Sequence, residues 1–570
     1  MSSETLEISG KQISLPTGLF IGGEFRKAQA GKTFPVENPA TGKEIIQVQE
    51  GLPEDVDEAV RVARKLFSSK EFQEYGATNR AKCLHKLADL MEEHFDELVA
   101  IEMIDTGKTQ LQASTLDVPA SIGTLRYYAG WADKILGQSS FDIPKVFGYT
   151  KREPVGVCGQ IIPWNFPLLM FTWKIAPAFA TGNTVVIKSA ETTPLNALKM
   201  CELIQKAGFP KGSINLVSGY GKTAGAAIAQ HMDIDKVAFT GSTATGRAIL
   251  RAAANSNLKK VTLELGGKSP NIVFPDADIE QAVDWSVWGI HMNFGQTCHA
   301  GTRIYVHEDV YDKFLDAYTA KMKAITVGDN FGKETDQGPQ NSKVQYERIM
   351  GYIEKGKEEG AKLHLGGNKV ETQGGGYFIE PTIFTDVKPH MKIMREEIFG
   401  PVVAVAKFTS EEEVLELAND TSYGLAAGIF TKDYERAVRV TSALKAGTTW
   451  VNLFNFVHWS LPFGGYKESG IGRECGDAAL ENYTEVKTVY WNMGMVGLQA
   501  LAAFVRRENV LMCSTERAAD WPEASRSCIA LESGRSSAVS HVRIDRLFAG
   551  ACASDIHQLL SFITFVTCVP

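Results

Sequence analysis

The fold is decided by one stretch, KVAFTGSTATGRAILRAAANSNLKKVTLEL, residues 236–265. It begins with KVAFT, a short apolar run rich in strand-forming residues, and ends with a second such run, KVTLEL. Between them lie a glycine-bounded turn and a segment with helical periodicity. A chain that returns to run parallel to its neighbouring strand needs a crossover of a dozen or more residues. The pattern therefore predicts a parallel strand–helix–strand unit.

The same alternation continues on both sides of this unit. Upstream strands are expected at GVCGQII (156–162), TVVIK (184–188) and INLV (214–217), with helical stretches between them. It resumes from NIVF (271–274) onward, and later runs such as VAVAKF, AAGIF and TTWVN extend it. Strands that alternate with helices of this length indicate an α/β protein with two doubly wound domains.

Size and charge narrow the class of protein. At 570 residues and 62.4 kDa the chain is too long for one ordinary core, so two or three domains are expected. The formal net charge of −8 argues against a nucleic-acid partner. The longest apolar runs are shorter than the roughly 20 residues that span a bilayer, so no membrane partner is expected. The N-terminal stretch resembles neither a signal peptide nor a presequence, which favours a cytoplasmic location.

The nine cysteines indicate neither a disulfide framework nor a metal site, because no C-x-x-C pair occurs. Cys83, Cys158 and Cys201 lie in apolar patterns and are interpreted as buried, inert thiols. Cys298 differs, because NFGQTCHAGTR (293–303) is polar and turn-prone. This stretch lies where the chain crosses from the first domain to the second, and clefts between domains are a preferred place for sites.

Two stretches could bind a nucleotide, and each has a plain structural alternative. GSTATG (241–246) opens a helix, and backbone N–H groups there suit a pyrophosphate, although a capped helix start explains Gly241 and Ser242 almost as well. Lys188 and Glu191 follow a strand, where ligands bind in open α/β sheets, but a solvated charge pair is the alternative. The lookalikes GGKS and GYGKT lack the first glycine of a phosphate loop, which argues against an ATPase.

Two further residues could take part in catalysis. In IIPWNFPLLM (161–170) the prolines stiffen the backbone around Asn165, whose amide could stabilise a developing oxyanion or simply support the loop. Glu264 ends an otherwise apolar strand. Burial there would raise its pKa and suit a general base, whereas capping or pairing at a strand end is the ordinary alternative.

Taken in order, these stretches resemble the NAD(P)-dependent aldehyde dehydrogenases over roughly residues 18–492. The match is most similar to the broad-specificity cytosolic and mitochondrial branch. The motifs that carry it are IIPWNFP, VVIKSAE, FTGSTATGR, VTLELGGKSPNIVF, FGQTCHAGTR, EEIFGPVV and PFGGYKESGIGRE.

The resemblance implies covalent catalysis. Cys298 matches the nucleophile that attacks an aldehyde to give a thiohemiacetal, which loses hydride to the nicotinamide and becomes a thioester. Asn165 and the backbone N–H of Cys298 match the oxyanion hole, and Glu264 matches the base that activates the hydrolytic water. Lys174 and Glu474 match positions of a proton relay.

A thiol needs activation, because at its ordinary pKa little thiolate exists at neutral pH. His299 is adjacent to Cys298, but neighbouring side chains usually diverge, so no Cys–His pair is expected.

The implied cofactor is NAD. The charge of Glu191 would repel the 2′-phosphate of NADP, so NAD should be preferred. Lys188 and Glu191 match adenosine-ribose contacts, and Glu397 and Phe399 match nicotinamide-ribose contacts. The full set of cofactor positions is Ile161, Trp164, Lys188, Glu191, Gly241, Ser242, Gly246, Glu397 and Phe399.

The implied substrate is a small-molecule aldehyde in an aromatic-rich tunnel. Such walls favour aliphatic or aromatic aldehydes, or a quaternary ammonium through cation–π contact. Core packing also explains Met170 and Trp173. The expected tunnel residues are Phe166, Met170, Trp173, Phe456 and Phe463.

The family fold implies a Rossmann-like NAD-binding domain (1–132 and 154–264), a catalytic domain (265–465) and a small β oligomerisation arm with a terminal strand (133–153 and 466–492). An exposed β edge normally pairs with another subunit, so a homodimer or homotetramer is expected.

The segment 493–570 is atypical: it has seven arginines, no lysine and four of the nine cysteines. We expect a disordered segment or an artefact of the gene model, with a functional appendage as the alternative. Peptides from this tail in mass spectra of the native protein would overturn the expectation.

Two other reactions compete with aldehyde oxidation. A CoA-acylating semialdehyde dehydrogenase would use a thiol in place of water, and Glu264 argues against it because hydrolysis needs a base. A non-redox thiol esterase, or a silent relative, is disfavoured by the joint presence of Cys298, Glu264 and Asn165.

Overall fold

The computed structural model describes residues 3–495 and 497. The chain divides into two units, Met1–Met493 and Gly494–Pro570, and the sheets and helices of the fold belong to the first unit. The atypical tail lies almost wholly outside the described residues, so its interpretation stays a prediction.

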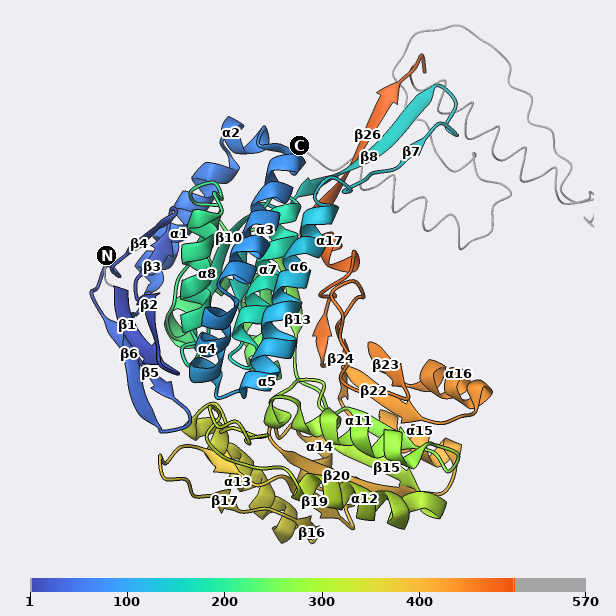
Figure 1. The fold of residues 1–570 in the computed structure, drawn as a ribbon. Helices are drawn as coiled ribbons and strands as arrows, with labels where there is room; N and C mark the ends of the chain where they lie inside the picture. Colours follow the sequence, from blue (N-terminus) through green and yellow to red (C-terminus); the bar gives the residue numbers. More distant parts are fainter. Residues whose placement is uncertain (1–2, 496, 498–570) are drawn as a thin grey trace, which may run out of the picture. The chain divides into compact units, whose positions relative to one another are not determined.

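The first sheet is the core of the N-terminal lobe (Figure 1). Its five central strands run parallel, as the alternation predicted, and the strands at its two edges are antiparallel. Four of the five central strands are buried throughout because helices cover both faces, which explains their continuous apolar runs. In spatial order the strands are β25 (Gly470–Ile471), β13 (Lys260–Glu264), β12 (Lys236–Thr240), β9 (Val157–Ile161), β10 (Thr184–Lys188), β11 (Ile214–Leu216), β3 (Leu19–Ile21) and β4 (Glu24–Arg26).

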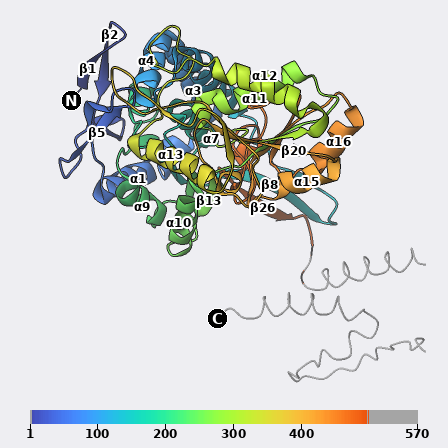
Figure 2. The ribbon, with the colours of Figure 1, turned by 90° about the horizontal axis from the view of Figure 1, so that it is seen from below.

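Two groups of helices cover the two faces of this sheet, as the view from below shows (Figure 2). One group is α1 (Pro53–Phe67), α9 (Ala226–Gln230) and α10 (Thr243–Ala254). The other is α3 (Gly76–Glu93), α4 (Phe95–Thr106), α6 (Val118–Trp131), α7 (Pro167–Ala180) and α8 (Leu195–Lys206). The helix α7 is buried on every side, which accounts for its nearly uniform apolar sequence.

The second sheet has seven strands, parallel except for the edge strand β16. Its helices also lie in two layers, α11 (Ile279–His291) with α12 (Tyr311–Lys323), and α13 (Lys343–Glu358) with α15 (Glu411–Asn419) and α16 (Tyr434–Ala443). In spatial order the strands are β16 (Lys362–Leu365), β19 (Thr382–Thr385), β20 (Val402–Phe408), β15 (Arg303–His307), β14 (Pro270–Val273), β22 (Ala426–Phe430) and β23 (Thr448–Val451).

A small antiparallel sheet projects from the N-terminal lobe (Figure 1). It consists of β7 (Ser139–Ser140), β8 (Val146–Pro154) and β26 (Thr484–Asn492), and β8 pairs with β26 along its whole length. Two doubly wound α/β lobes plus a β arm confirm the expected fold class. The exact domain boundaries stay a prediction. Within the described part of the chain, no helix combines the length and apolarity needed to cross a membrane.

Candidate active site

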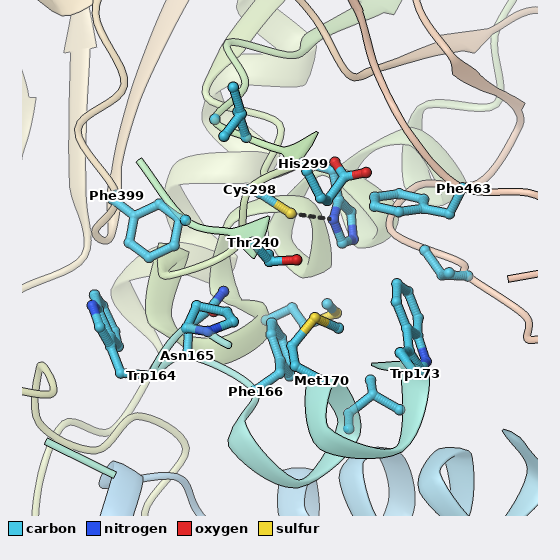
Figure 3. Close-up of a pocket in the computed structure, with 18 of the residues that line it drawn as sticks. Trp164, Asn165, Phe166, Met170, Trp173, Thr240, Cys298, His299, Phe399 and Phe463 are labelled. Atoms are coloured by element: carbon cyan, nitrogen blue, oxygen red, sulfur yellow. Dashed lines mark hydrogen bonds between the residues drawn. The ribbon is translucent and has the colours of Figure 1, made fainter. Parts of the chain in front are cut away.

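A cavity forms at the carboxyl ends of β12 and β13, where they face the loop after a short 3₁₀ turn, η3 (Met292–Gly295). Both lobes contribute to its wall, and Figure 3 shows Cys298 and His299 opposite Asn165 and Met170. Many residues expected from the sequence meet here. They are Trp164, Asn165, Phe166, Met170, Trp173, Gly241, Ser242, Glu264, Cys298, Glu397, Phe399 and Phe463.

The loop that carries Cys298 has a strained backbone. Asn293, Phe294 and Gly295 have φ values of 47°, 57° and 76°, so three consecutive residues are left-handed. The conformation costs roughly 1–2 kcal/mol for each non-glycine residue. A Cβ at Gly295 would lie 2.0 Å from the carbonyl oxygen of Gly400, so only glycine fits. This turn leaves the thiol half-buried in the cavity wall.

The surroundings of Cys298 keep its thiol protonated. Burial raises its pKa well above the ordinary value, and the carboxylates of Glu264 and Glu397 raise it further. Hydrogen bonds from the backbone N–H groups of Cys298 and His299 act in the opposite direction but are weaker. A base must therefore remove the thiol proton before the sulfur can attack.

His299 approaches the thiol, so the expectation that the two neighbouring side chains diverge was wrong. Its Nδ1 lies 3.5 Å from Cys298 Sγ (Figure 3). The two residues occupy a turn, where neighbouring side chains do not alternate as they do in a strand. Burial lowers the pKa of His299 to about 3, so the ring is neutral. The ring is therefore a hydrogen-bond partner of the sulfur and not a charged activator.

Asn165 lies opposite the thiol-bearing loop, just beyond β9 (Figure 3). Its side-chain Nδ2 donates a hydrogen bond to the carbonyl oxygen of Gln296 at 2.9 Å. An amide has two N–H donors, so one remains for a group in the cavity.

Glu264 is buried at the end of β13, and its Oε1 has no hydrogen-bond partner among the described residues. Burial raises its pKa well above the ordinary value, and repulsion from Glu474 adds to the effect. Lys174 and Arg473 act in the opposite direction. A carboxylate of this kind takes up a proton more readily than an exposed one, as a general base requires.

Lys174 and Glu474 lie behind the cavity wall and do not line it. Lys174 Nζ lies 2.5 Å from Glu474 Oε1 and donates to Thr240 Oγ1 at 2.9 Å. Thr240 lines the cavity, so a chain of polar groups connects the buried ion pair to the cavity surface.

Lys188 and Glu191 form an ion pair that is buried at the lysine and 39% exposed at the glutamate side chain. The Lys188 side chain is only 3% exposed, and its Nζ lies 3.1 Å from Glu191 Oε2. Glu191 and Ile161 line a second pocket, beside α10, together with Gly225 and Phe239. The pocket combines an apolar slot with a carboxylate at its side.

The three residues of the glycine-bounded turn have different environments. Gly241 and Ser242 line the cavity, and Ser242 caps α10 by accepting from the backbone N–H of Thr245 at 3.3 Å. Gly246 lines neither pocket. A Cβ there would lie 2.7 Å from Leu265 Cδ2, so this glycine lets α10 pack closely on the sheet. The structure therefore does not bring Gly246 to the site surface.

Glu397 and Phe399 form another part of the cavity wall. Glu397 Oε1 accepts a hydrogen bond from the backbone N–H of Gly267 at 2.9 Å, and burial raises the pKa of the carboxyl to about 7. The Phe399 ring lies edge-on to Trp164, with 5.3 Å between the ring centroids.

The expected tunnel residues do not all reach the cavity. Phe166, Met170, Trp173 and Phe463 line it, and the Trp173 and Phe463 rings are 5.8 Å apart. Phe456 does not, because its side chain is 55% exposed. Its carbonyl instead accepts from the indole N–H of Trp450, and the flanking Asn455 and Val457 line the cavity.

Sequence reasoning missed several wall residues. Thr240 ends a strand of the parallel sheet, so the rule that ligands bind at carboxyl ends could have found it. Gln345 donates to the carbonyl of Phe399 at 2.7 Å, and Arg348 donates to that of Glu397 at 3.1 Å. No local pattern marks either residue. The same is true of Leu116, Ala120 and Thr124, which come from a distant helical segment.

Comparison with known proteins shows the family to which the chain is similar. The profile described as "Aldehyde dehydrogenase family" matches residues 25–489. An aldehyde dehydrogenase of Alternaria alternata is 56% identical over 481 residues, which are 84% of this chain and 96% of that protein. The mitochondrial aldehyde dehydrogenase of Homo sapiens is 52% identical over 472 residues, 83% of this chain and 91% of that protein.

A solved structure shows the same relationship. The NAD+ complex of the aldehyde dehydrogenase from Bacillus cereus superimposes with a TM-score of 0.82 at 51% identity, over 84% of this chain and 96% of that one. The resemblance drawn from the motifs is confirmed.

Proposed function

We propose a reaction path for this chain from the premise that it belongs to the aldehyde dehydrogenase family, in which it is an NAD-dependent aldehyde dehydrogenase. The path oxidises an aldehyde to its carboxylic acid through a covalent intermediate on Cys298. One observation carries the proposal: the Cys298 thiol, the Asn165 amide and the Glu264 carboxyl line the same cavity.

In the first step Cys298 adds to the aldehyde. Glu264 takes the thiol proton, which its raised pKa favours, and Sγ bonds to the carbonyl carbon. The electron pair of the C=O bond moves to oxygen. We assign the free Asn165 N–H and the backbone N–H of Cys298 as donors to this oxyanion, since donors that face developing charge lower the barrier.

In the second step the oxyanion re-forms the C=O bond, and the hydrogen on that carbon leaves with its electron pair. Bound NAD+ supplies the acceptor for this hydride. Sγ is left in a thioester with the acyl group.

In the third step water cleaves the thioester. Glu264 passes its first proton on through Thr240 towards Lys174 and Glu474, and is then free to deprotonate the water. Water oxygen bonds to the acyl carbon, the C–S bond breaks, and the acid and the Cys298 thiolate separate. The hydrogen bonds from Lys174 to Thr240 and Glu474 support the inner part of this relay, and Thr240 is the neighbour of Glu264 across the paired strands.

The pocket beside α10 suits the adenosine end of a dinucleotide. The apolar slot of Ile161 and Phe239 suits a base, and the Lys188–Glu191 pair can accept from and donate to ribose hydroxyls. We assign Gly241 and Ser242 to the pyrophosphate, since they lie at the start of α10. The second acceptor oxygen of Glu397, with Phe399 and Trp164, is assigned to the nicotinamide end.

The position of Glu191 supports NAD over NADP. Its carboxylate would lie beside a 2′-phosphate, and like charges repel. Equal or better catalytic efficiency with NADP would reject this preference.

The decisive assay follows NADH at 340 nm with acetaldehyde, with and without CoA, for the wild type and Cys298→Ala. We expect oxidation without CoA and a loss of at least about 10⁴-fold in the variant, the scale on which removal of a nucleophile acts. A requirement for CoA would favour the acylating reaction. Full turnover in Cys298→Ala would refute the covalent mechanism. Ester cleavage without NADH formation would favour an esterase.

We also propose a homodimer or homotetramer built on the arm. Phe141, Val486 and Tyr490 expose large apolar side chains on this thin sheet, which a partner subunit would cover. Light scattering on the purified protein measures the assembly, and a monomer would refute the proposal.

A cytoplasmic location completes the proposal, although one relative at 52% identity is named mitochondrial. Fractionation of the source cells distinguishes the two compartments.

A further inference from the structure

We propose that Asn293 is a positioning residue that holds the oxyanion donor Asn165 and the thiol-bearing loop in one rigid unit. The inference rests on the function proposed above and extends it to a residue outside the cavity lining.

The side chain of Asn293 connects the two halves of the proposed oxyanion hole. It is 1% exposed, and its Nδ2 donates to the carbonyl oxygen of Asn165 at 2.8 Å and to that of Gln296 at 3.2 Å. Asn165 Nδ2 donates to the same Gln296 carbonyl at 2.9 Å. Two amides thus converge on one carbonyl that lies two residues before Cys298.

The backbone of Asn293 is anchored from a third segment. Its N–H donates to Gln112 Oε1 at 2.9 Å, and its carbonyl accepts from both the backbone and the side chain of Gln296. Asn293 therefore contacts three separate parts of the chain: the helical segment at Gln112, the stiff loop at Asn165 and the turn that leads to the thiol.

This arrangement fixes the direction of the catalytic donor. One N–H of Asn165 is held by the Gln296 carbonyl, so the other is left for a group in the cavity that Asn165 lines. If Asn293 no longer holds the Asn165 carbonyl, that loop can rotate relative to the sulfur. A misplacement of about 1 Å costs roughly 100-fold in rate, although the substrate still contacts the same walls.

The strained φ separates the role of the side chain from that of the backbone. Glycine adopts the left-handed conformation at φ 47° at least as readily as asparagine does. Asn293→Gly therefore removes the two side-chain hydrogen bonds without adding backbone strain. If asparagine were present only for its tolerance of the left-handed conformation, this variant would behave as the wild type.

Asn452 provides a matched control. It is also left-handed, with φ 59°, and its side chain exchanges two 3.0 Å hydrogen bonds with the backbone of Thr431, outside both pockets. Asn452→Gly thus removes equivalent bonds without touching the proposed oxyanion hole.

The test compares steady-state acetaldehyde oxidation in these variants, with turnover normalised to the folded fraction from circular dichroism. We expect Asn293→Gly to lower kcat about 10- to 100-fold with KM within about threefold, and Asn452→Gly to leave both unchanged. Asn293→Asp serves as a second variant if the glycine variant folds poorly, because aspartate tolerates the left-handed conformation but has no side-chain N–H to donate, and it should also lower kcat.

The Asn165→Ala background gives a readout that a merely structural role would not change. If Asn293 acts through Asn165, adding Asn293→Gly to Asn165→Ala should lower kcat less than about threefold further. An equal loss in both backgrounds, or an unchanged kcat in Asn293→Gly alone, would overturn the inference. If Cys298→Ala were fully active, the proposed function itself would fail instead.

Discussion

Two regions bring polar groups to the same cavity by opposite means. At the strand ends of the first sheet, Thr240 and Glu264 are neighbours because β12 and β13 pair in parallel register. In the loop before Cys298, three left-handed residues are held by contacts from distant segments. The strand-end residues are thus positioned by regular strand pairing. The thiol, by contrast, is positioned by hydrogen bonds from particular side chains and by a glycine that no other residue can replace.

The largest effect is expected at the strand end. Glu264→Gln removes the proposed base while keeping its shape, and kcat should fall by about 10²–10⁴-fold. Because Glu264 serves both the thiol and the water in the proposed path, NADH should form slowly from the first turnover, without a burst. A wild-type rate, or a full burst of NADH before a slow steady state, would contradict the role of Glu264 at the thiol.

The pH dependence follows from the same groups. Burial raises the pKa of both Glu264 and Cys298, so protons hold on to them at a pH where ordinary carboxyls have ionised. Wild-type activity should therefore rise with pH above the range in which ordinary carboxyls ionise, and it should be low at lower pH, where both groups are protonated. The kcat profile of Glu264→Gln should lack the limb that belongs to the carboxyl.

An intermediate effect is expected in the loop. Gly295→Ala introduces a Cβ 2.0 Å from the Gly400 carbonyl at φ 76°, so the loop must move. Strain of this kind costs about 1–3 kcal/mol, which should lower the melting temperature. Displacement of the thiol should lower kcat more than tenfold. Unchanged kcat would show that the thiol's position does not depend on this turn.

The smallest effect is expected at Gly246, which lies in the regular helix α10. Gly246→Ala places a Cβ 2.7 Å from a flexible Leu265 methyl group, and the higher helix propensity of alanine offsets part of the overpacking. Chemical denaturation should show a loss of about 1 kcal/mol, with kcat unchanged and the KM for NAD raised at most a few-fold. A kcat loss equal to that of Gly295→Ala would show that Gly246 does contribute to the active site.

This contrast also explains what the sequence could predict. The strands at 184–188 and 236–240 agree with β10 and β12 to the residue, because buried parallel strands have continuous apolar runs. Glu264 and Asn165 were found as polar residues in otherwise apolar or stiffened settings. Cys298 differed from the other cysteines by its polar, turn-prone surroundings, and the motifs of the family then gave its role and the remaining cofactor positions.

Two of the failures, at His299 and Phe456, concern side-chain direction in irregular segments. His299 was expected to turn away from Cys298, and Phe456 was expected in the tunnel, but a turn has no fixed alternation from which to derive either direction. Gln345 and Arg348 escaped notice because they act through the backbone carbonyls of a remote loop. Such relations exist only once the chain has folded.

The strand β25 has a consequence for synthesis of the protein. Gly470 pairs beside Glu264, and Glu474 neutralises Lys174, although these partners are separated by more than two hundred residues. During synthesis the thiol of Cys298 is therefore made well before the strand that pairs with Glu264 and the carboxylate that neutralises Lys174. The buried groups behind the cavity can reach their final arrangement only after nearly all of the folded part of the chain has left the ribosome.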